Sequence, residues 1–485
     1  MQLPDAKSKS YTERLLDDYE AAGGWINRKV FGLSSFPAMG YGAIAKSAIP
    51  SDTPLFHVPL GMVLSPQSSD LKAKLSAEEW ESLGTGWSPL ILTMMWESSK
   101  GPASAWNYYL ESMPTEFDTP MLWEPEHLAE LAGTDVAKRI GREEAESEYT
   151  NLIQPILKAH SDLFPANSPH FDLTAFHLHG SRILSRSFMV PATIFNVEYQ
   201  REKDDGDTDD GADDLMTVMI PMADMLNAAY HSDNARLFDD DDDASQLRPR
   251  HLGPGFTMVS TKEVKQNEQI FNTYSSPPNS ELLRKYGHVD VLALDNDILS
   301  CLDDEWIGGW PYGNPGDEVE LDGNLVVEAF QNLGGSSNVD VEERVNYWLD
   351  DGQEDAFYLT LADSLDRGLI AFARILLYDN EWLRFKEKGK LPVATVDKTV
   401  HAILNGAIER RLSFYKTDLQ SDLELLKQGS MSLRARAAAI VRVGEKRILL
   451  RTMRAIGSAA QTAEALSKKR DLDGQKDPAQ KRRKG

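Results

Sequence analysis

The chain has 485 residues, 41% of them hydrophobic, and its 51 basic against 76 acidic side chains give a formal net charge of −25. This length allows about two to four domains with substantial cores, and the negative charge argues against nonspecific binding to nucleic acid. The single cysteine, Cys301, excludes an intrachain disulfide framework and a cysteine-based zinc cluster. We expect no membrane span, because no apolar run reaches about 18 residues, and a reducing intracellular setting.

The amino-terminal part changes from polar to strand-like. A short helix is predicted over Tyr11–Ala22, where Gly23 and Gly24 end it. Beyond Gly40-Tyr41-Gly42, turn residues separate short runs of strand character. These strand-like runs cover residues 43–46, 54–58 and 62–65. The glycines let a backbone approach a ligand closely, although most such pairs simply make turns.

The next stretch, residues 67–180, has helical spacing and capping residues. Predicted helices cover residues 71–83, 89–97, 104–113, 125–131 and 143–159. Another helix is predicted over Ala175–Met189. Its His177 and His179 are expected to be structural, because the sequence shows no third residue that would complete a metal site.

Two short motifs in the centre of the chain follow predicted strands at 217–220, 256–260 and 269–273. One is Asp224-Met225-Leu226-Asn227, and the other is Phe271-Asn272-Thr273-Tyr274. Side chains placed just past strand ends are available to a ligand. Aspartate-rich runs at 204–214 and 239–243 flank the first motif. They lack the spacing of a calcium-binding loop and are expected to be solvated insertions.

The carboxyl-terminal part is predicted to be mostly helical, with amphipathic segments at 359–377, 399–414, 419–426 and 433–453. The arginines and lysines of the last segment are expected to form a solvated face. Beyond it, Lys468-Lys469-Arg470 and Lys481-Arg482-Arg483-Lys484 have the spacing of a bipartite nuclear import signal. The sequence therefore predicts a nuclear protein that binds an import receptor, with a solubilising or RNA-touching tail as the alternative.

These motifs together resemble the SET-domain lysine methyltransferases. The branch in question contains the Rubisco large-subunit methyltransferase, animal SET-domain-containing protein 6 and, most alike in layout, fungal ribosomal lysine N-methyltransferase 4. The resemblance covers roughly residues 20–290 and rests on residues 38–43, Trp106 to Leu110 with Met113-Pro114, Ser185-Arg186-Ser187-Phe188, the two central motifs, and Tyr286-Gly287.

The resemblance implies an α+β protein, in which a β-rich SET fold is split by a helical insertion and followed by a mostly α-helical substrate-binding domain. The boundaries we expect are a tail and helix at 1–23, the first SET part at 24–66, the insertion at 67–180, the second SET part with acidic loops at 181–290, the helical substrate-binding domain at 291–457, and a disordered basic tail at 458–485.

The resemblance also implies a cofactor, S-adenosyl-L-methionine, and a role for particular residues. The expected cofactor-binding residues are Met39, Gly40, Tyr41, Gly42, Arg186, Asp224, Asn227, Ala228 and Tyr286. The guanidinium of Arg186 would bind the cofactor carboxylate in a fork geometry that a lysine cannot reproduce. The expected substrate-binding residues are Trp106, Ser187, Phe188, Tyr274 and Tyr286, and Tyr274 is the expected catalytic residue.

Methyl transfer to lysine is an in-line displacement that needs positioning and desolvation of a neutral amine, and no metal. Lysine is mostly protonated near neutral pH, so a narrow apolar channel beside a sulfonium must lower its pKa. A tyrosine hydroxyl at the channel end can accept a hydrogen bond from the amine, and Tyr274 is the candidate. Packing with a satisfied hydroxyl is the ordinary alternative for such a tyrosine.

The chain departs from the family pattern at Ala228, where most members have histidine after the asparagine. A backbone contact to adenine survives this change, whereas a side-chain contact does not; His231 is a possible substitute. An inactive SET-fold module that binds a basic protein therefore stays open as an alternative. The preferred substrate is a basic protein, specifically a lysine of a large-subunit ribosomal protein, with histones and transcription factors as alternatives.

Overall fold

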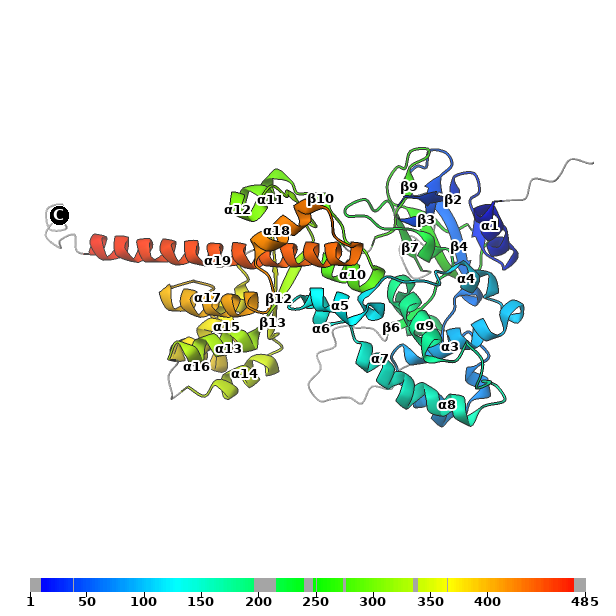
Figure 1. Cartoon of the computed structure of the whole chain (residues 1–485), viewed down its shortest axis with the longest axis horizontal. Helices are drawn as coiled ribbons and strands as arrows, with labels where there is room; N and C mark the ends of the chain where they lie inside the picture. The colour runs from blue at the N-terminus through cyan, green and yellow to red at the C-terminus, as the bar shows by residue number, and fades with distance from the viewer. Residues whose placement is uncertain are drawn as a thin grey trace, which may run out of the picture. The chain divides into compact units, whose positions relative to one another are not determined.

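The computed structural model describes residues 10–37, 39–195, 215–239, 247–249, 251–273, 276–334, 339–363 and 365–474 (Figure 1). The chain divides into two compact units. Unit 1 comprises residues 1–117 and 141–276, and unit 2 comprises residues 118–140 and 277–485. Residues 118–140, which the sequence groups with the helical insertion, therefore cluster with the carboxyl-terminal half.

Unit 1 is built around small antiparallel sheets. One sheet has the order β1 (Trp25–Ile26), β4 (Pro54–Pro59), β8 (Gly255–Ser260) and β7 (Ala235–Phe238). A second has the order β2 (Phe31–Phe36), β3 (Gly40–Ala45) and β9 (Gln269–Ile270). A two-stranded ribbon pairs β5 (Phe188–Pro191) with β6 (Leu215–Val218). Strands distant in sequence are thus neighbours, which brings the two central motifs to one region.

The helices of unit 1 are α1 (Tyr11–Ala21), α2 (Ala77–Glu81), α3 (Ser88–Ser99), α4 (Asn107–Ser112), α7 (Arg142–Glu148), α8 (Gln154–Ala159) and α9 (Leu173–Arg186). Asp172 caps α9 by accepting from the Ala175 N–H. The predicted helix over Ala175–Met189 is wrong at its end. Ser187 is extended, and Phe188 starts a strand because its register with Val218 pairs β5 to β6.

Unit 2 is mostly helical, with α5 (Pro125–Leu128), α6 (Asp135–Lys138), α10 (Asn279–Tyr286), α11 (Asn296–Ser300), α12 (Asp304–Ile307), α13 (Gly323–Asn332), α14 (Val341–Asp350), α15 (Arg367–Leu377), α16 (Asp379–Lys388), α17 (Lys398–Leu412), α18 (Leu419–Gln428) and α19 (Leu433–Gly474). Two antiparallel ribbons pair β10 (Leu292–Ala293) with β11 (Tyr312–Gly313), and β12 (Glu318–Asp322) with β13 (Ala356–Thr360).

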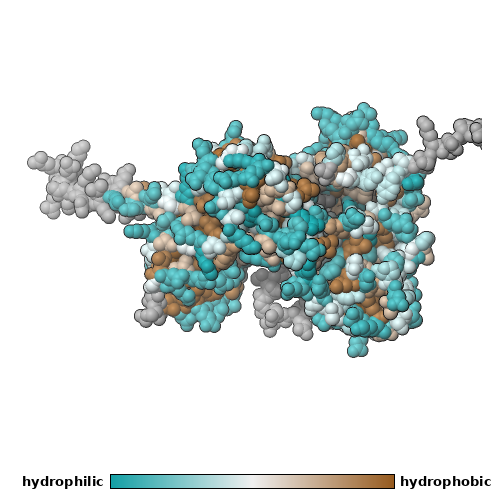
Figure 2. Space-filling view, in the orientation of Figure 1, coloured by the Kyte–Doolittle hydropathy of each residue, from teal (hydrophilic) through white to brown (hydrophobic). Residues whose placement is uncertain are grey.

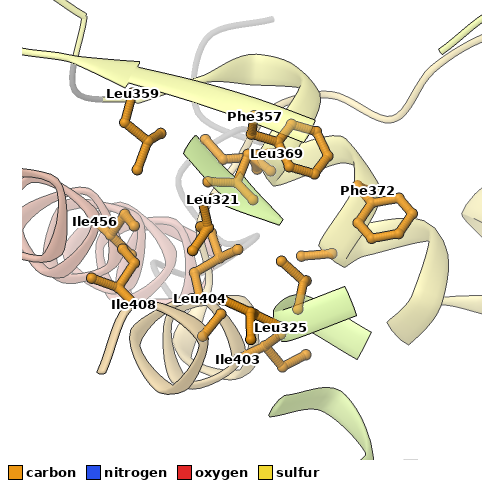
Figure 3. Packing of buried hydrophobic residues seen from close by; sticks show 14 of the residues in the cluster. Leu321, Leu325, Phe357, Leu359, Leu369, Phe372, Ile403, Leu404, Ile408 and Ile456 are labelled. Carbon is orange, nitrogen blue, oxygen red and sulfur yellow. The ribbon is translucent and has the colours of Figure 1, made fainter. Parts of the chain in front are cut away.

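The predicted helix over 359–377 is wrong in its first part. Phe357 and Leu359 alternate with more exposed neighbours, which is the period of a strand, and β13 pairs with β12. The helix starts only at Arg367, where Asp366 accepts from the Leu369 N–H. Figure 3 shows the result: Phe357 and Leu359 of β13 lie in one apolar cluster with side chains of β12, α13, α15, α17 and α19.

Three basic residues of α19, Arg442, Lys446 and Arg447, are buried and so depart from the solvated face that the sequence predicts, whereas Arg454 is exposed. Arg442 and Lys446 are buried and both pair with Asp422 of α18, which is itself buried. Arg447 donates to the carbonyl oxygens of Trp306, Ile307, Trp310 and Tyr312. These cations are buried because partners from other elements satisfy their donors, and spacing along one helix carries no information about such partners.

Two buried carboxyl groups of unit 2 make its stability depend on pH. Burial raises the pKa of Asp317 to about 7 and, with the neighbouring Asp135, that of Glu445 to about 8. The unfolded chain releases these protons near the ordinary values of 3.8 and 4.5, so the stabilisation fades as pH rises through 7 and 8. We expect the free energy of unfolding to fall by roughly 2–4 kcal/mol between pH 6 and 8.5.

Denaturant unfolding of the full chain at the two pH values measures this loss. In Glu445→Gln, whose amide oxygen can still accept from the Asp135 N–H while its amide nitrogen donates to the Tyr415 hydroxyl oxygen, the difference between the two pH values should shrink. An unchanged difference would remove Glu445 from the explanation.

Across the face seen in Figure 2, hydrophilic side chains are spread between smaller apolar areas. Within the described ranges, no helix is both long and apolar enough to cross a membrane.

Candidate active site

Gly42 of β3 packs against two side-chain amides. A Cβ at this position would lie 2.5 Å from Asn227 Nδ2 and 2.8 Å from Gln269 Nε2. Real Cβ atoms do not approach this closely, so a larger residue at this position would push the ends of these two side chains aside. Among the described residues, the buried Gln269 Nε2 has no hydrogen-bond partner. From the sequence we expect Gly42 to let the backbone approach a ligand closely. In the structure its immediate neighbours are these two amides.

The two central motifs meet through a backbone hydrogen bond. The Asn272 N–H donates to the Asn227 carbonyl oxygen over 3.0 Å, and the Asn272 side chain accepts from the Thr273 N–H at 2.9 Å. The Asn227 amide in turn donates to the Tyr41 carbonyl oxygen at 3.4 Å. Tyr274 lies outside the described residues, but the segment leading to it is fixed beside Asn227 as far as Thr273.

Arg186 is held by Asp224. Its Nη1 donates to the Asp224 carbonyl oxygen at 3.0 Å and lies 3.2 Å from Oδ2 of the same residue. The Asp224 side chain is 1% exposed, while that of Arg186 is 24% exposed. Asp224 lies within the short 3₁₀ turn η8 (Ala223–Met225), and the backbone is extended at the next residue, Leu226. Asp224 is therefore placed to orient Arg186, whose guanidinium stays partly exposed.

Tyr109 of α4 is a residue of this region that the sequence does not single out, although it belongs to the Trp106 motif. Burial and the neighbouring Asp224 raise the pKa of Tyr109, so its hydroxyl keeps its proton. Burial also raises the pKa of Asp224, although Arg186 acts in the opposite direction. The spacing Trp-x-x-Tyr is the signal that could have identified Tyr109 as the inward-facing partner.

An exposed apolar surface lies along the first predicted cofactor segment. Met39 is 38% exposed and Tyr41 is 46% exposed. The ring of Tyr11, the first residue of α1, lies 5.1 Å from that of Tyr41. Tyr11 also has Arg186 among its charged neighbours. This aromatic pair, which the sequence does not indicate, borders the segment Gly40–Gly42.

The remaining predicted residues are distributed as follows. Trp106 is buried, and its indole N–H donates to the Met62 carbonyl oxygen. Ser187 caps the end of α9, and Phe188 is half-buried in β5. Ala228 follows Asn227 and is half-buried. Tyr286 is the last residue of α10 in unit 2, with its ring 6.0 Å from that of His288.

The family model for the substrate-binding domain of the Rubisco large-subunit methyltransferase matches residues 340–449. The chain is 27% identical to the mouse (Mus musculus) N-lysine methyltransferase SETD6 over 441 residues, 85% of this chain and 84% of that protein. It is 30% identical to Ribosomal lysine N-methyltransferase 4 of Saccharomyces cerevisiae over 256 residues, 52% of this chain and 49% of the yeast protein.

Among solved structures, that of Rubisco LSMT bound to AdoMet superposes with a TM-score of 0.63 at 18% identity and covers 93% of each chain. The same protein bound to sinefungin and monomethyllysine superposes with a TM-score of 0.62 at 19% identity, covering 92% of this chain and 91% of that one. The fold is therefore the predicted one: a mixed α+β SET fold with a helical carboxyl-terminal domain.

Proposed function

We infer that this chain is a SET-class protein-lysine N-methyltransferase of the branch that contains the Rubisco large-subunit enzyme and SETD6, and that it uses S-adenosylmethionine. One contact carries the argument from structure. The hydrogen bond from Asn272 to Asn227 joins the predicted cofactor motif to the segment that leads to Tyr274. The predicted cofactor residue Asn227 then lies beside the segment that precedes the predicted catalytic Tyr274, which supports a transfer between two bound molecules.

The residues near Asn227 fit such a cofactor. Arg186 offers a partly exposed guanidinium for a carboxylate, and the Gln269 Nε2 donor is buried without a partner among the described residues. The exposed Met39 and Tyr41 supply apolar surface. When bound, the cofactor provides the electrophilic methyl group. Arg186 and Asn227 would hold the cofactor. The Tyr274 hydroxyl would accept a hydrogen bond from the substrate amine and so direct the lone pair of the amine nitrogen at the methyl group.

Gly42→Ala tests this assignment. The added Cβ would displace the Asn227 amide, the Gln269 amide or both. Both amides end flexible side chains that can move aside, so the expected loss is in cofactor contacts: hydrogen bonds worth about 1.5 kcal/mol correspond to an affinity for S-adenosylmethionine lower by about tenfold. Calorimetric titration of the cofactor gives the value. Gly61→Ala, where an added Cβ meets nothing within 4 Å, is the control, and equal affinity of the Gly42 variant would contradict the assignment.

For the substrate we propose a lysine of a large-subunit ribosomal protein. The 30% identity to the yeast relative named for ribosomal lysine methylation supports this choice, and the net charge of −25 suits a basic partner. The longer match, to N-lysine methyltransferase SETD6, names no substrate, and lysines of histones or transcription factors are the competing class. We also propose nuclear localisation through the basic tail. Its first basic cluster, at 468–470, belongs to helix α19, which continues to Gly474 and so corrects the expectation of disorder from residue 458, and its second cluster lies outside the described residues.

Incubation of the protein with methyl-labelled S-adenosylmethionine tests the function. Separate reactions should contain purified ribosomal proteins, core histones and bovine albumin. We expect label on a ribosomal protein, recovered as methyl-lysine after hydrolysis. Label on histones alone would overturn the ribosomal proposal, and binding of cofactor without label in any reaction would favour the inactive module that the Ala228 replacement keeps open.

A further inference from the structure

Asn234 holds the end of β9 with both its side chain and its backbone. Its Oδ1 accepts from the Phe271 N–H at 2.8 Å, and its Nδ2 donates to the Gln269 carbonyl oxygen at 3.1 Å. Its own backbone N–H donates to the Phe271 carbonyl oxygen at 3.1 Å. Asn234 thus bonds to Gln269 and Phe271, the residues on either side of Ile270, at the end of β9.

Asn234 is itself anchored to a different sheet. Its carbonyl oxygen accepts from the Thr261 N–H at 2.8 Å, directly after β8. The next residue, Ala235, starts β7 in register with Ser260. Asn234 therefore connects the sheet β1-β4-β8-β7 to the segment that continues from β9, and the position of Phe271 depends on both.

The segment that Asn234 holds is the one that joins the two motifs. The residue after Phe271 is Asn272, which donates to the Asn227 carbonyl oxygen and accepts from the Thr273 N–H. A displacement of Phe271 would therefore move Asn272 relative to Asn227, and with it the direction in which the chain enters residue 274.

We propose that Asn234 is a positioning residue for methyl transfer: its amide group holds Gln269 and Phe271, and through them keeps the segment that leads to Tyr274 beside the Asn227 backbone. The proposal rests on the function inferred above. Asn234 touches neither substrate nor cofactor, and it acts through the backbone of the segment it holds. An asparagine that only forms a turn would not need to bond both sides of a strand residue.

Two variants separate positioning from general stability. Asn234→Asp keeps the acceptor for the Phe271 N–H but replaces the donor to the Gln269 carbonyl with a second acceptor, whereas Asn234→Ala removes both bonds. A displacement of about 1 Å at a reacting group lowers rates by about 100-fold. We expect kcat to fall by about that factor in Asn234→Ala and by less in Asn234→Asp, while KM for S-adenosylmethionine changes less than about threefold.

Gln266→Ala is the matched control, because its amide donates to the Lys46 carbonyl oxygen in the exposed turn before β9. It should keep full kcat. Hydrogen exchange should show faster exchange of the Phe271 amide in Asn234→Ala with the rest of unit 1 protected, which shows that the effect is local.

The outcomes distinguish the two proposals. Lysine methylation by the wild-type protein with an unchanged kcat in Asn234→Ala would overturn the role of Asn234 and leave the function intact. A loss of cofactor binding and of protection throughout unit 1 in both variants would also overturn it, since Asn234 would then be structural. Absence of methylation by the wild-type protein would overturn the function itself, whatever the exchange of Phe271.

Discussion

Tyr274→Phe should lower kcat for lysine methylation by about 10²- to 10⁴-fold, the range typical for loss of a group that handles a proton or orients a reacting amine. Affinity for S-adenosylmethionine should stay within a few-fold, because Asn227 and Arg186 are unchanged. The phenyl ring still fills its space, so the loss isolates the hydroxyl. Single-turnover assays with saturating cofactor measure the chemical step directly.

Tyr149→Phe provides the control for the loss of a tyrosine hydroxyl in unit 1. Tyr149 donates to the Phe171 carbonyl oxygen in the helical part of the unit and has no predicted role in transfer. It should retain nearly full kcat. A Tyr274→Phe protein with an unchanged rate would mean that another group orients the amine, and the catalytic assignment would be lost.

Arg186→Met should reduce affinity for S-adenosylmethionine by about 30-fold to several thousand-fold, since truncating one partner of a partly buried charge pair costs about 2–5 kcal/mol. Arg186→Lys should recover only part of this loss, because an ammonium cannot donate in a planar fork to a carboxylate. Calorimetric titration separates the three proteins. Arg236→Met, which removes an exposed guanidinium of β7, should bind the cofactor normally.

The same Arg186→Met variant should become less stable as pH rises. Burial already raises the pKa of Asp224, and loss of Arg186 removes the group that most strongly opposes this rise. A carboxyl group whose folded pKa is raised keeps its proton in the folded state and loses that stabilisation as pH rises through the folded pKa. A variant that is equally destabilised at pH 5 and pH 8 would contradict the ion pair as the cause.

The sequence predicts the local motifs well because their side chains and spacing are specific. Asn227 and the segment leading to Tyr274 lie together, as expected from motifs that follow strand ends. The helix over residues 11–22 and the strand over residues 256–260 are confirmed, since caps, glycines and β-branched residues mark them. These signals are local, so a single sequence contains them.

What the sequence misses depends on partners far along the chain. Helical spacing continues from Arg186 into Met189, but pairing with β6 decides in favour of a strand. The sequence predicts that Arg442 is exposed to solvent, whereas in the structure it is buried and pairs with Asp422 of α18. Asn234 has no signal in the sequence, because its role depends on hydrogen bonds to the distant residues Phe271 and Gln269. Each of these outcomes is a tertiary contact that overrides a local preference.

A crystal structure of the protein with S-adenosylhomocysteine and methyl-lysine bound tests the central claim most directly. We predict that the Asn227 backbone or amide contacts the cofactor product, that Arg186 meets its carboxylate, and that the Tyr274 hydroxyl lies within hydrogen-bond distance of the methyl-lysine nitrogen in the same slot. A cofactor bound away from Asn227, or a Tyr274 hydroxyl directed away from the lysine, would contradict the account.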